Sequence, residues 1–270
     1  VDFFLGYSPE RVNPGDKKRT IDKINKVISG QNKKVETILF DIYSKLTEGE
    51  IFLAKNIKVA EASKVIENAQ RDINIAFINE VAKICSKLNI SIYDVLDASN
   101  TKWNFLPFLP GLVGGHCIGV DPYYLSHKAK ELKVDPEVIL SGRRTNDNMP
   151  KFIFKEIQKR LKKKANILFL GVTFKEDVPD LRNSKAIELL SYFQQPKFDV
   201  FINDPFINDD THIKYKDLIE KSFDAIILTV PHTFYKEKFL HIKKLLKKDG
   251  ILFDIKGIFR NKNMKNYWSL

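Results

Sequence analysis

The most reactive side chain in the sequence stands in a short glycine-rich stretch. Residues 114–122 read GGHCIGVDP and place three glycines around Cys117. Glycines reach backbone conformations that other residues avoid, and they let a substrate come close to the main chain. Asp121 and Pro122 are typical of the N-cap and first turn of a helix, and a helix N-terminus favours a thiolate. The stretch therefore predicts a nucleophilic Cys117, with Asp121 able to hold a water or orient the site.

Other interpretations of these residue types are less favoured. A lone cysteine is commonly a small buried apolar side chain, and this is the interpretation we adopt for Cys85, which lies between apolar neighbours in a helical pattern. His116 invites a Cys–His protease interpretation, but adjacent residues in an extended loop point apart. The sequence has no CxxC and no pair of histidines at ligand spacing, so no metal site is expected.

A second group of polar residues lies inside a long helical pattern. The pattern runs from Val59 to Leu88 without proline or glycine, and its apolar residues form a broad surface. A helix of this length exceeds the usual globular length, which favours packing against a second subunit. Lys64 and Asn68 are four residues apart and share one face. Taken alone, these two residues predict a solvent-facing stripe.

The C-terminal part of the chain alternates short apolar runs with helical stretches. This alternation favours a parallel sheet covered on both faces, which is a doubly wound, Rossmann-like α/β fold. No GxGxxG sequence follows its first strand or occurs elsewhere in the chain, so the chain carries no complete dinucleotide-binding motif. The predicted strands are 166–172, 199–203, 225–230 and 251–255, and the predicted helices between them are 184–193, 215–221 and 239–247.

The first part of the chain resembles a fragment of another α/β unit. Short strands are predicted in the FFLGYS run, at 26–29 and at 51–53, with a helix at 35–45. So few strands cannot bury a core alone, which indicates a truncated α/β remnant whose N-terminal part is absent. We therefore expect three parts: an N-terminal remnant (1–58), a central helical region (59–150) and a C-terminal domain (151–270).

The central region joins the long helix to the C-terminal domain. Residues 103–119 are rich in aromatic residues, proline and glycine, which predicts a long functional loop. Start signals at Asp121-Pro122 and Asp135-Pro136 predict helices to about residue 130 and residue 144. A break is expected at 146–150, and then a basic amphipathic helix at 151–163.

Composition excludes several protein classes. The 270 residues carry 45 Lys and Arg against 34 Asp and Glu, a net charge of +11, but the basic residues are scattered, which favours a solvated surface over nucleic-acid binding. Two cysteines exclude a disulfide framework. No apolar run is long enough for a membrane span, and no secretory signal is visible. Cytoplasmic residence is therefore expected.

Five segments, in order, carry a resemblance to a known family. They read YSPERVNPGD, AEASKVIENAQRDINIAFINE, KWNFLPFLPGLVGGHCIGVDPYYL, SGRRTNDNMP and GVTFKEDVPDLRNS. Over nearly its whole length the chain resembles the UDP-glucose/GDP-mannose dehydrogenase family, and within it the bacterial UDP-N-acetylhexosamine 6-dehydrogenases of surface-polysaccharide synthesis, the Vi-antigen type. The resemblance implies a homodimer that uses NAD to oxidise the C6 alcohol of a UDP-sugar to a carboxylate.

The resemblance also assigns roles to individual residues. Cys117 would attack the aldehyde, Lys64 would stabilise the oxyanion with Asn68 as a second donor, and Asp121 and Glu10 would position water. Substrate contacts are implied at Phe108, Gly111, Gly114, Phe174 and Lys175, and a contact to NAD at Arg182. Arg143 and Arg144 are either a phosphate contact or charges at a helix end.

The chain departs from the family in one respect. Family members carry an N-terminal Rossmann domain before the SPER segment, with the glycine-rich loop of the NAD site, and this chain does not contain it. We therefore expect the chain to be unable to oxidise substrate alone. A non-catalytic module for UDP-sugar binding or dimerisation is the alternative.

Overall fold

The computed structural model describes residues 3–161, 164–218 and 221–270. The chain divides into two compact units, each described below by itself. Unit 1 comprises Val1–Gln70 and Asp121–Asp135, and unit 2 comprises Arg71–Val120 and Pro136–Leu270. The division into 1–58, 59–150 and 151–270 stays a prediction.

Unit 1 contains a small three-stranded sheet. Strand β2 (Lys26–Gly30) pairs antiparallel with β1 (Gly6–Tyr7) and parallel with β3 (Ile51–Leu53). Helix α1 (Lys33–Leu46) connects β2 to β3 and begins where the side chain of Asn32 accepts a hydrogen bond from the Val35 backbone N–H. These elements match the strands and helix predicted for the first part of the chain.

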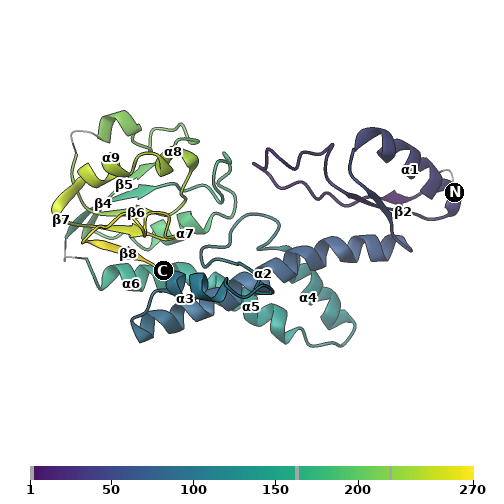
Figure 1. Ribbon diagram of the computed structural model, residues 1–270, viewed down its shortest axis with the longest axis horizontal. Helices are drawn as coiled ribbons and strands as arrows, with labels where there is room; N and C mark the ends of the chain where they lie inside the picture. Colours follow the sequence, from purple (N-terminus) through teal and green to yellow (C-terminus); the bar gives the residue numbers. More distant parts are fainter. Residues whose placement is uncertain (1–2, 162–163, 219–220) are drawn as a thin grey trace. The chain divides into compact units, whose positions relative to one another are not determined.

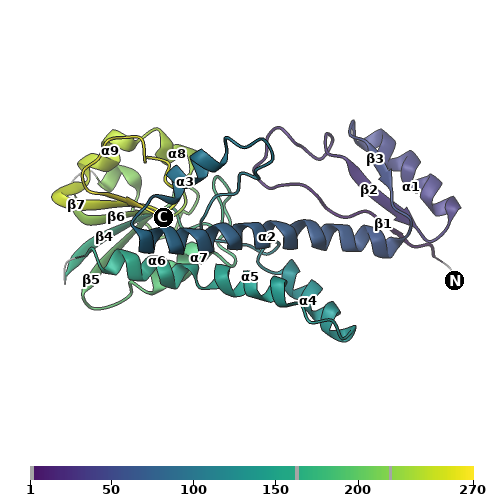
Figure 2. The same ribbon diagram turned by 60° about the horizontal axis from the view of Figure 1, so that its bottom comes forward.

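The long helix is confirmed as α2 (Ile57–Leu88). Its C-terminal half belongs to unit 2, where Ile78, Ala82 and Cys85 enter a buried cluster with side chains of α6 (Met149–Gln158). Figure 2 shows α6 running beside this half of α2. Cys85 is only 4% exposed, so its interpretation as a small buried apolar residue is confirmed.

Unit 2 is built around the predicted parallel sheet (Figure 1). The strand order is β5-β4-β6-β7-β8, and every neighbouring pair is parallel. Strand β8 was not predicted. The strands are β4 (Ala165–Leu170), β5 (Phe198–Asn203), β6 (Phe223–Leu228), β7 (Leu246–Asp254) and β8 (Tyr267–Ser269).

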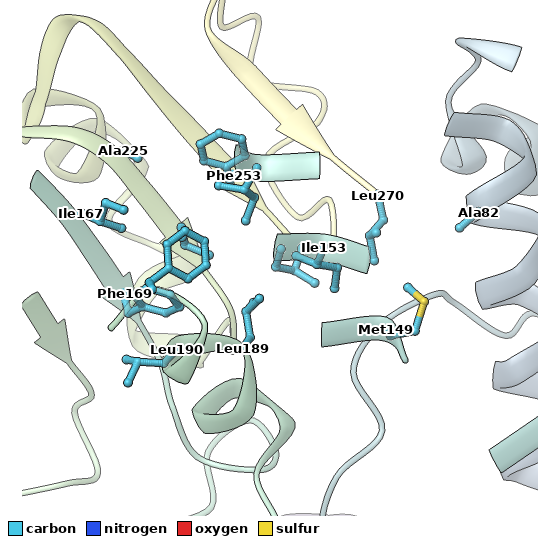
Figure 3. Close-up of a cluster of buried hydrophobic side chains, with 14 of the residues drawn as sticks. Ala82, Met149, Ile153, Ile167, Phe169, Leu189, Leu190, Ala225, Phe253 and Leu270 are labelled. Carbon is cyan, nitrogen blue, oxygen red and sulfur yellow. The ribbon is translucent and has the colours of Figure 1, made fainter. Parts of the chain in front are cut away.

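Alternate side chains of β4 enter two different cores, which confirms that both faces of the sheet are covered. Ile167 and Phe169 pack with α6 and α7 (Lys185–Ser191) in the cluster of Figure 3. Leu168 and Leu170 pack in a second cluster with residues of α8 (Thr233–Lys236) and α9 (Phe239–Lys244). A strand that is apolar on both sides is typical of a parallel sheet between helical layers.

Several predicted boundaries are wrong. The helix predicted from Asp135-Pro136 is α5 (Glu137–Asp147), and Pro136 rather than Asp135 is its N-cap. The break expected at 146–150 is confined to Asn148, which stays in a right-handed helical conformation between α5 and α6. Residues 162–163 of the helix predicted at 151–163 lie outside the described residues, and α6 ends at Gln158.

The helical stretches of the C-terminal domain also differ in detail. The helix predicted at 215–221 is a short 3-10 helix, η1 (Tyr215–Leu218), and residues 219–220 of that prediction lie outside the described residues. Lys247 belongs to β7 rather than to the preceding helix. Helices α3 (Ile92–Ser99) and α4 (Asp121–Glu131) complete the structure. No helix within the three described ranges is both long and apolar enough to cross a membrane.

Candidate active site

The cysteine loop, which is the loop at residues 103–119 that carries Cys117, packs onto the start of the C-terminal domain. Cys117 is exposed, and its backbone carbonyl accepts a hydrogen bond from the Val120 N–H at 3.0 Å. Gly115 has a φ of +85°, and a Cβ there would lie 2.7 Å from the ring of Phe174. Only glycine therefore fits this position. Its N–H donates to the carbonyl of Asn183 at 3.1 Å, so the loop is held beside Phe174 with its thiol accessible.

Phe174 and Lys175 lie on the segment that follows β4, at the carboxyl edge of the sheet. Ligands of doubly wound sheets bind at this edge. The segment lines a pocket together with residues that follow β6 and β7 and with Leu112 of the cysteine loop. The structure therefore brings three predicted substrate residues of unit 2, Gly114, Phe174 and Lys175, into one region.

The pocket is lined by three lysines, of which only Lys175 was predicted. Lys256, which follows β7, pairs with Glu176 at 2.5 Å. Although burial would raise the pKa of Glu176, the Lys256 ammonium group holds that pKa below its usual value. Lys185, at the start of α7, pairs with Glu188 at 2.7 Å and with Asp147 at 3.1 Å. A pocket lined by several ammonium groups suits a ligand that carries phosphates.

A buried histidine anchors the segment that carries Phe174 and Lys175. His232 is fully buried; its Nδ1 accepts the Asp177 backbone N–H at 2.9 Å, so its proton lies on Nε2, which is 3.1 Å from Asp204 Oδ2. That same carboxylate oxygen accepts the N–H groups of Val172 and Thr173. The backbone before and after the two pocket residues is therefore fixed. Sequence analysis missed His232 and Asp204, although both are polar residues that follow predicted strands.

The predicted polar residues of unit 1 are partly brought together. Asn68 Nδ2 donates to Asp121 Oδ2 at 2.6 Å, which joins α2 to the first residue of α4. Lys64 is half-buried one turn before Asn68 on α2. Glu10 is exposed in the loop after β1, where its carboxylate accepts the Val12 N–H at 2.6 Å. The pairing of Lys64 with Cys117 stays a prediction.

Tyr7 is a further polar residue in this part of unit 1. Burial raises the pKa of its phenol, and the negative charges of Glu61 and Asp121 raise that pKa further. Tyr7 therefore lies close enough to Asp121, the partner of Asn68, for the carboxylate charge to raise the pKa of its phenol. The YSPER motif did not predict that Tyr7 and Asp121 are neighbours, because the two residues are far apart in sequence.

The remaining predicted residues of unit 2 have distinct environments. Phe108 is half-buried against the main core, and Gly111 is buried and bonded to Asn79. Arg182 is exposed, and its guanidinium group binds both oxygens of the Asp180 carboxylate. Arg143 is only 2% exposed and pairs with Asp72 and Asp147. This buried position makes Arg143 an internal ion-pair residue, which neither sequence alternative foresaw.

Two sequence profiles match the chain. One describes the central domain of the UDP-glucose/GDP-mannose dehydrogenase family and matches residues 58–148. The other describes the UDP binding domain of the same family and matches residues 168–261. The second match contains the segment that carries Phe174 and Lys175.

Known proteins with similar sequences and structures agree with these matches. Protein CapL of Staphylococcus aureus is 50% identical over 96% of this chain and 64% of its own length. A UDP-N-acetyl-D-glucosamine 6-dehydrogenase of Pseudomonas aeruginosa is 43% identical over 94% of this chain and 64% of its own length. A solved UDP-N-acetylmannosamine dehydrogenase of Pyrococcus horikoshii superposes with a TM-score of 0.86 at 29% identity, covering 100% of this chain and 65% of its own. The chain therefore spans about 64% of the length of the first two relatives.

Proposed function

The chain belongs to the UDP-glucose/GDP-mannose dehydrogenase family. We therefore propose that it forms part of an enzyme that oxidises C6 of a UDP-N-acetylhexosamine for surface-polysaccharide synthesis. One observation carries the proposal: the glycine loop with an exposed Cys117 packs onto Phe174, beside a pocket lined by three lysines. This arrangement provides a nucleophile next to a site that suits a nucleoside diphosphate. The names of the Pseudomonas relative and the Pyrococcus structure support the N-acetylated sugar.

The thiol accounts for an oxidation that proceeds beyond the aldehyde. In the first step the C6 alcohol loses a hydride and a proton and becomes an aldehyde. The Cys117 sulfur then adds to the aldehyde carbon and gives a thiohemiacetal, which loses a second hydride and proton to become a thioester. Water hydrolyses the thioester, which releases the carboxylate and restores the thiol. NAD, when bound, would accept one hydride in each oxidation.

Polar residues of unit 1 are proposed to assist these steps. Lys64 would stabilise the negative oxygen that develops when sulfur adds to the aldehyde, and Asn68 would act as a second donor. Asp121, which accepts a hydrogen bond from Asn68 at 2.6 Å, would position water for hydrolysis together with Glu10. The hydrogen bond supports this assignment because it fixes the carboxylate at the start of α4.

Only the edge of an NAD site fits residues of this chain. The exposed guanidinium group of Arg182 fits a contact to the cofactor's phosphates. The chain contains no GxGxxG loop, so its residues do not complete a dinucleotide site. We therefore propose that catalysis needs a separate segment that holds NAD.

We also propose that the chain forms a homodimer in the cytoplasm. Phe77, Ile84 and Leu88 lie along one face of α2 and are 63%, 52% and 62% exposed. An exposed apolar stripe of this kind is typical of a protein interface. A second copy of the chain suits it because oligomers of one chain commonly bury the same patch on both subunits.

Calorimetry with the purified chain would test the substrate class. UDP and UDP-N-acetylglucosamine should bind, and NAD should bind far more weakly. A Lys175→Ala variant should lose UDP affinity, whereas Lys130→Ala, an exposed lysine of α4, should retain it. Equal affinity of both variants for UDP would contradict the assignment of Lys175.

The alternative is a non-catalytic module for UDP-sugar binding. The missing GxGxxG loop favours it. The two functions differ in the full-length protein, because only the enzyme would form a UDP-sugar carboxylate when NAD is supplied. If the protein bound the UDP-sugar but formed no UDP-sugar carboxylate with NAD, the function would be that of a non-catalytic binding module.

A further inference from the structure

Asn79 of α2 holds the backbone of Gly111 from both sides. Its side-chain oxygen accepts the Gly111 N–H at 2.8 Å, and its Nδ2 donates to the Gly111 carbonyl at 3.0 Å. Asn79 is fully buried and Gly111 is buried as well. Because water cannot replace a lost partner there, the two bonds are expected to persist in the folded protein.

The orientation of Asn79 is itself fixed by a second buried amide. Its Nδ2 also donates to Asn146 Oδ1 at 2.8 Å. Asn146, which is fully buried on α5, donates in turn to the Asp72 carbonyl at 2.9 Å and to its carboxylate at 2.7 Å. The side-chain amides of Asn79 and Asn146 thus each have a donor and an acceptor as partners, which define the orientation of the amide.

The same network reaches the pocket by a second route. Arg143 bridges Asp72 and Asp147, and Asp147 binds the ammonium group of Lys185 at 3.1 Å. Lys185 lines the pocket with Phe174 and Lys175. One network of buried and half-buried groups therefore connects the loop at Gly111 to the pocket lysine Lys185.

Gly111 and Gly115 are the two fixed points of the loop over the pocket. Asn79 holds Gly111, and the Asn183 carbonyl holds the Gly115 N–H at 3.1 Å. Leu112, between them, lines the pocket. A movement of Gly111 would consequently move a wall of the pocket without touching the sheet.

We infer that Asn79 and Asn146 are positioning residues for substrate binding: they fix the loop at Gly111 so that residues 111–115 face the pocket in one conformation. This inference rests on the proposed function, because it takes the pocket ligand to be a UDP-sugar. The effect would be on affinity for the sugar more than for UDP, since Phe108, Gly111 and Gly114 lie where the family resemblance implies that a loop wraps the sugar. Neither asparagine would touch the substrate.

The variant Asn79→Asp tests the inference with little change in volume. It retains an acceptor for the Gly111 N–H but places an oxygen against the Gly111 carbonyl and Asn146 Oδ1. We expect affinity for UDP-N-acetylglucosamine to fall by about tenfold, with a smaller fall for UDP. Hydrogen exchange in a peptide covering 106–115 should become faster, while exchange in β4 and β6 stays unchanged. Asn100→Asp, on an exposed residue, is the matched control.

A second variant, Asn146→Ser, covers the case in which Asn79→Asp fails to fold. It breaks the link one residue away from Gly111 and should give the same pattern with a smaller loss. If either folded variant exchanges faster at the loop but binds the UDP-sugar like the unaltered chain, the inference is overturned. Unchanged loop exchange would overturn it too. Failure of the unaltered chain to bind the UDP-sugar would instead contradict the proposed function, and with it this inference.

Discussion

Because Gly115 has no side chain, the cysteine loop can lie directly against Phe174. Gly115→Ala would combine a φ of +85° with a Cβ placed 2.7 Å from the aromatic ring. We expect a loss of about 1–3 kcal/mol in the free energy of unfolding, and weaker UDP-sugar binding. Gly119→Ala is the control, because its Cβ would meet no atom closer than 3.5 Å. Urea unfolding and calorimetry would measure both effects, and equal behaviour of the two variants would contradict the argument.

The exposed thiol gives a prediction for catalysis. If the chain serves the proposed oxidation, Cys117→Ser should abolish formation of the carboxylate in a preparation that also contains the NAD-binding segment, because a serine hydroxyl is a far weaker nucleophile at neutral pH. Cys85→Ala, at the buried cysteine, should retain turnover while lowering stability by about 1 kcal/mol. Chromatographic detection of the UDP-sugar carboxylate distinguishes the two. Normal carboxylate formation by Cys117→Ser would refute the role of the thiol.

Asp254 gives a pH-dependent prediction. Burial raises the pKa of its carboxyl group above the usual value, even though the Phe259 N–H and the Tyr267 hydroxyl donate to it. The folded state therefore binds this proton more tightly than the unfolded state, and the group's contribution to stability falls as the pH rises from the unfolded to the folded pKa. Above the folded pKa the contribution stays constant.

Asp254→Asn removes this titration. The free energy of unfolding of the variant, relative to the unaltered chain, should rise as the pH increases through that interval. Urea unfolding at several pH values would measure it, with Trp268 of β8 as the fluorescent reporter because it contacts Phe253 at a ring distance of 5.8 Å. A difference between the two proteins that is constant with pH would exclude Asp254 as the cause.

At the scale of elements, the exposed face of α2 carries the dimer prediction. Phe77→Glu would place a charge at the N-terminal end of the apolar stripe, and we expect it to convert a dimer into a monomer, because an unpaired charge in an interface is costly. Sedimentation analysis would measure the molecular mass. Leu240→Glu is the control, because Leu240 is 73% exposed on α9, away from the stripe. A Phe77→Glu dimer as stable as the unaltered one would place the interface elsewhere.

Elements with a strong period could be predicted from the sequence. Helix α2 and the strands β4 to β7 follow helical spacing or continuous apolar runs, and each was found, although β7 begins at Leu246, five residues before the predicted start. Helix α8 is too short to carry a helical period, and strand β8 was not predicted. The break around Asn148 was overestimated because polar residues there, such as Asn146, face a buried network rather than water.

The candidate site was predictable only where one motif supplied it. The glycine stretch led to the proposal of Cys117, and the segment after β4 led to the proposals of Phe174 and Lys175. Asn79, His232 and Lys256 belong to the same region through contacts across long sequence separations. A single sequence gives no period or spacing that links them. Their partners became visible only after the sheet and α2 were assembled.

At the scale of the whole molecule, we propose that the chain carries the substrate chemistry while a separate segment holds NAD. The residues proposed for the thiol, the oxyanion and the UDP-sugar lie within it, whereas a GxGxxG loop does not. A mixture of the 270-residue chain, UDP-N-acetylglucosamine and NAD should therefore produce no NADH absorbance. Steady NADH production at an enzymatic rate would show that the chain completes a cofactor site in another way.

The position of Leu270 affects how the protein should be prepared. Strand β8 lies at the edge of the sheet, and Leu270 immediately after it is only 8% exposed in the main core (Figure 3). Residues joined to Leu270 would have to leave directly from a packed apolar cluster. An affinity tag or fluorescent fusion at that end would therefore pull on the edge strand, whereas one attached ahead of the exposed Phe3 would leave the sheet undisturbed.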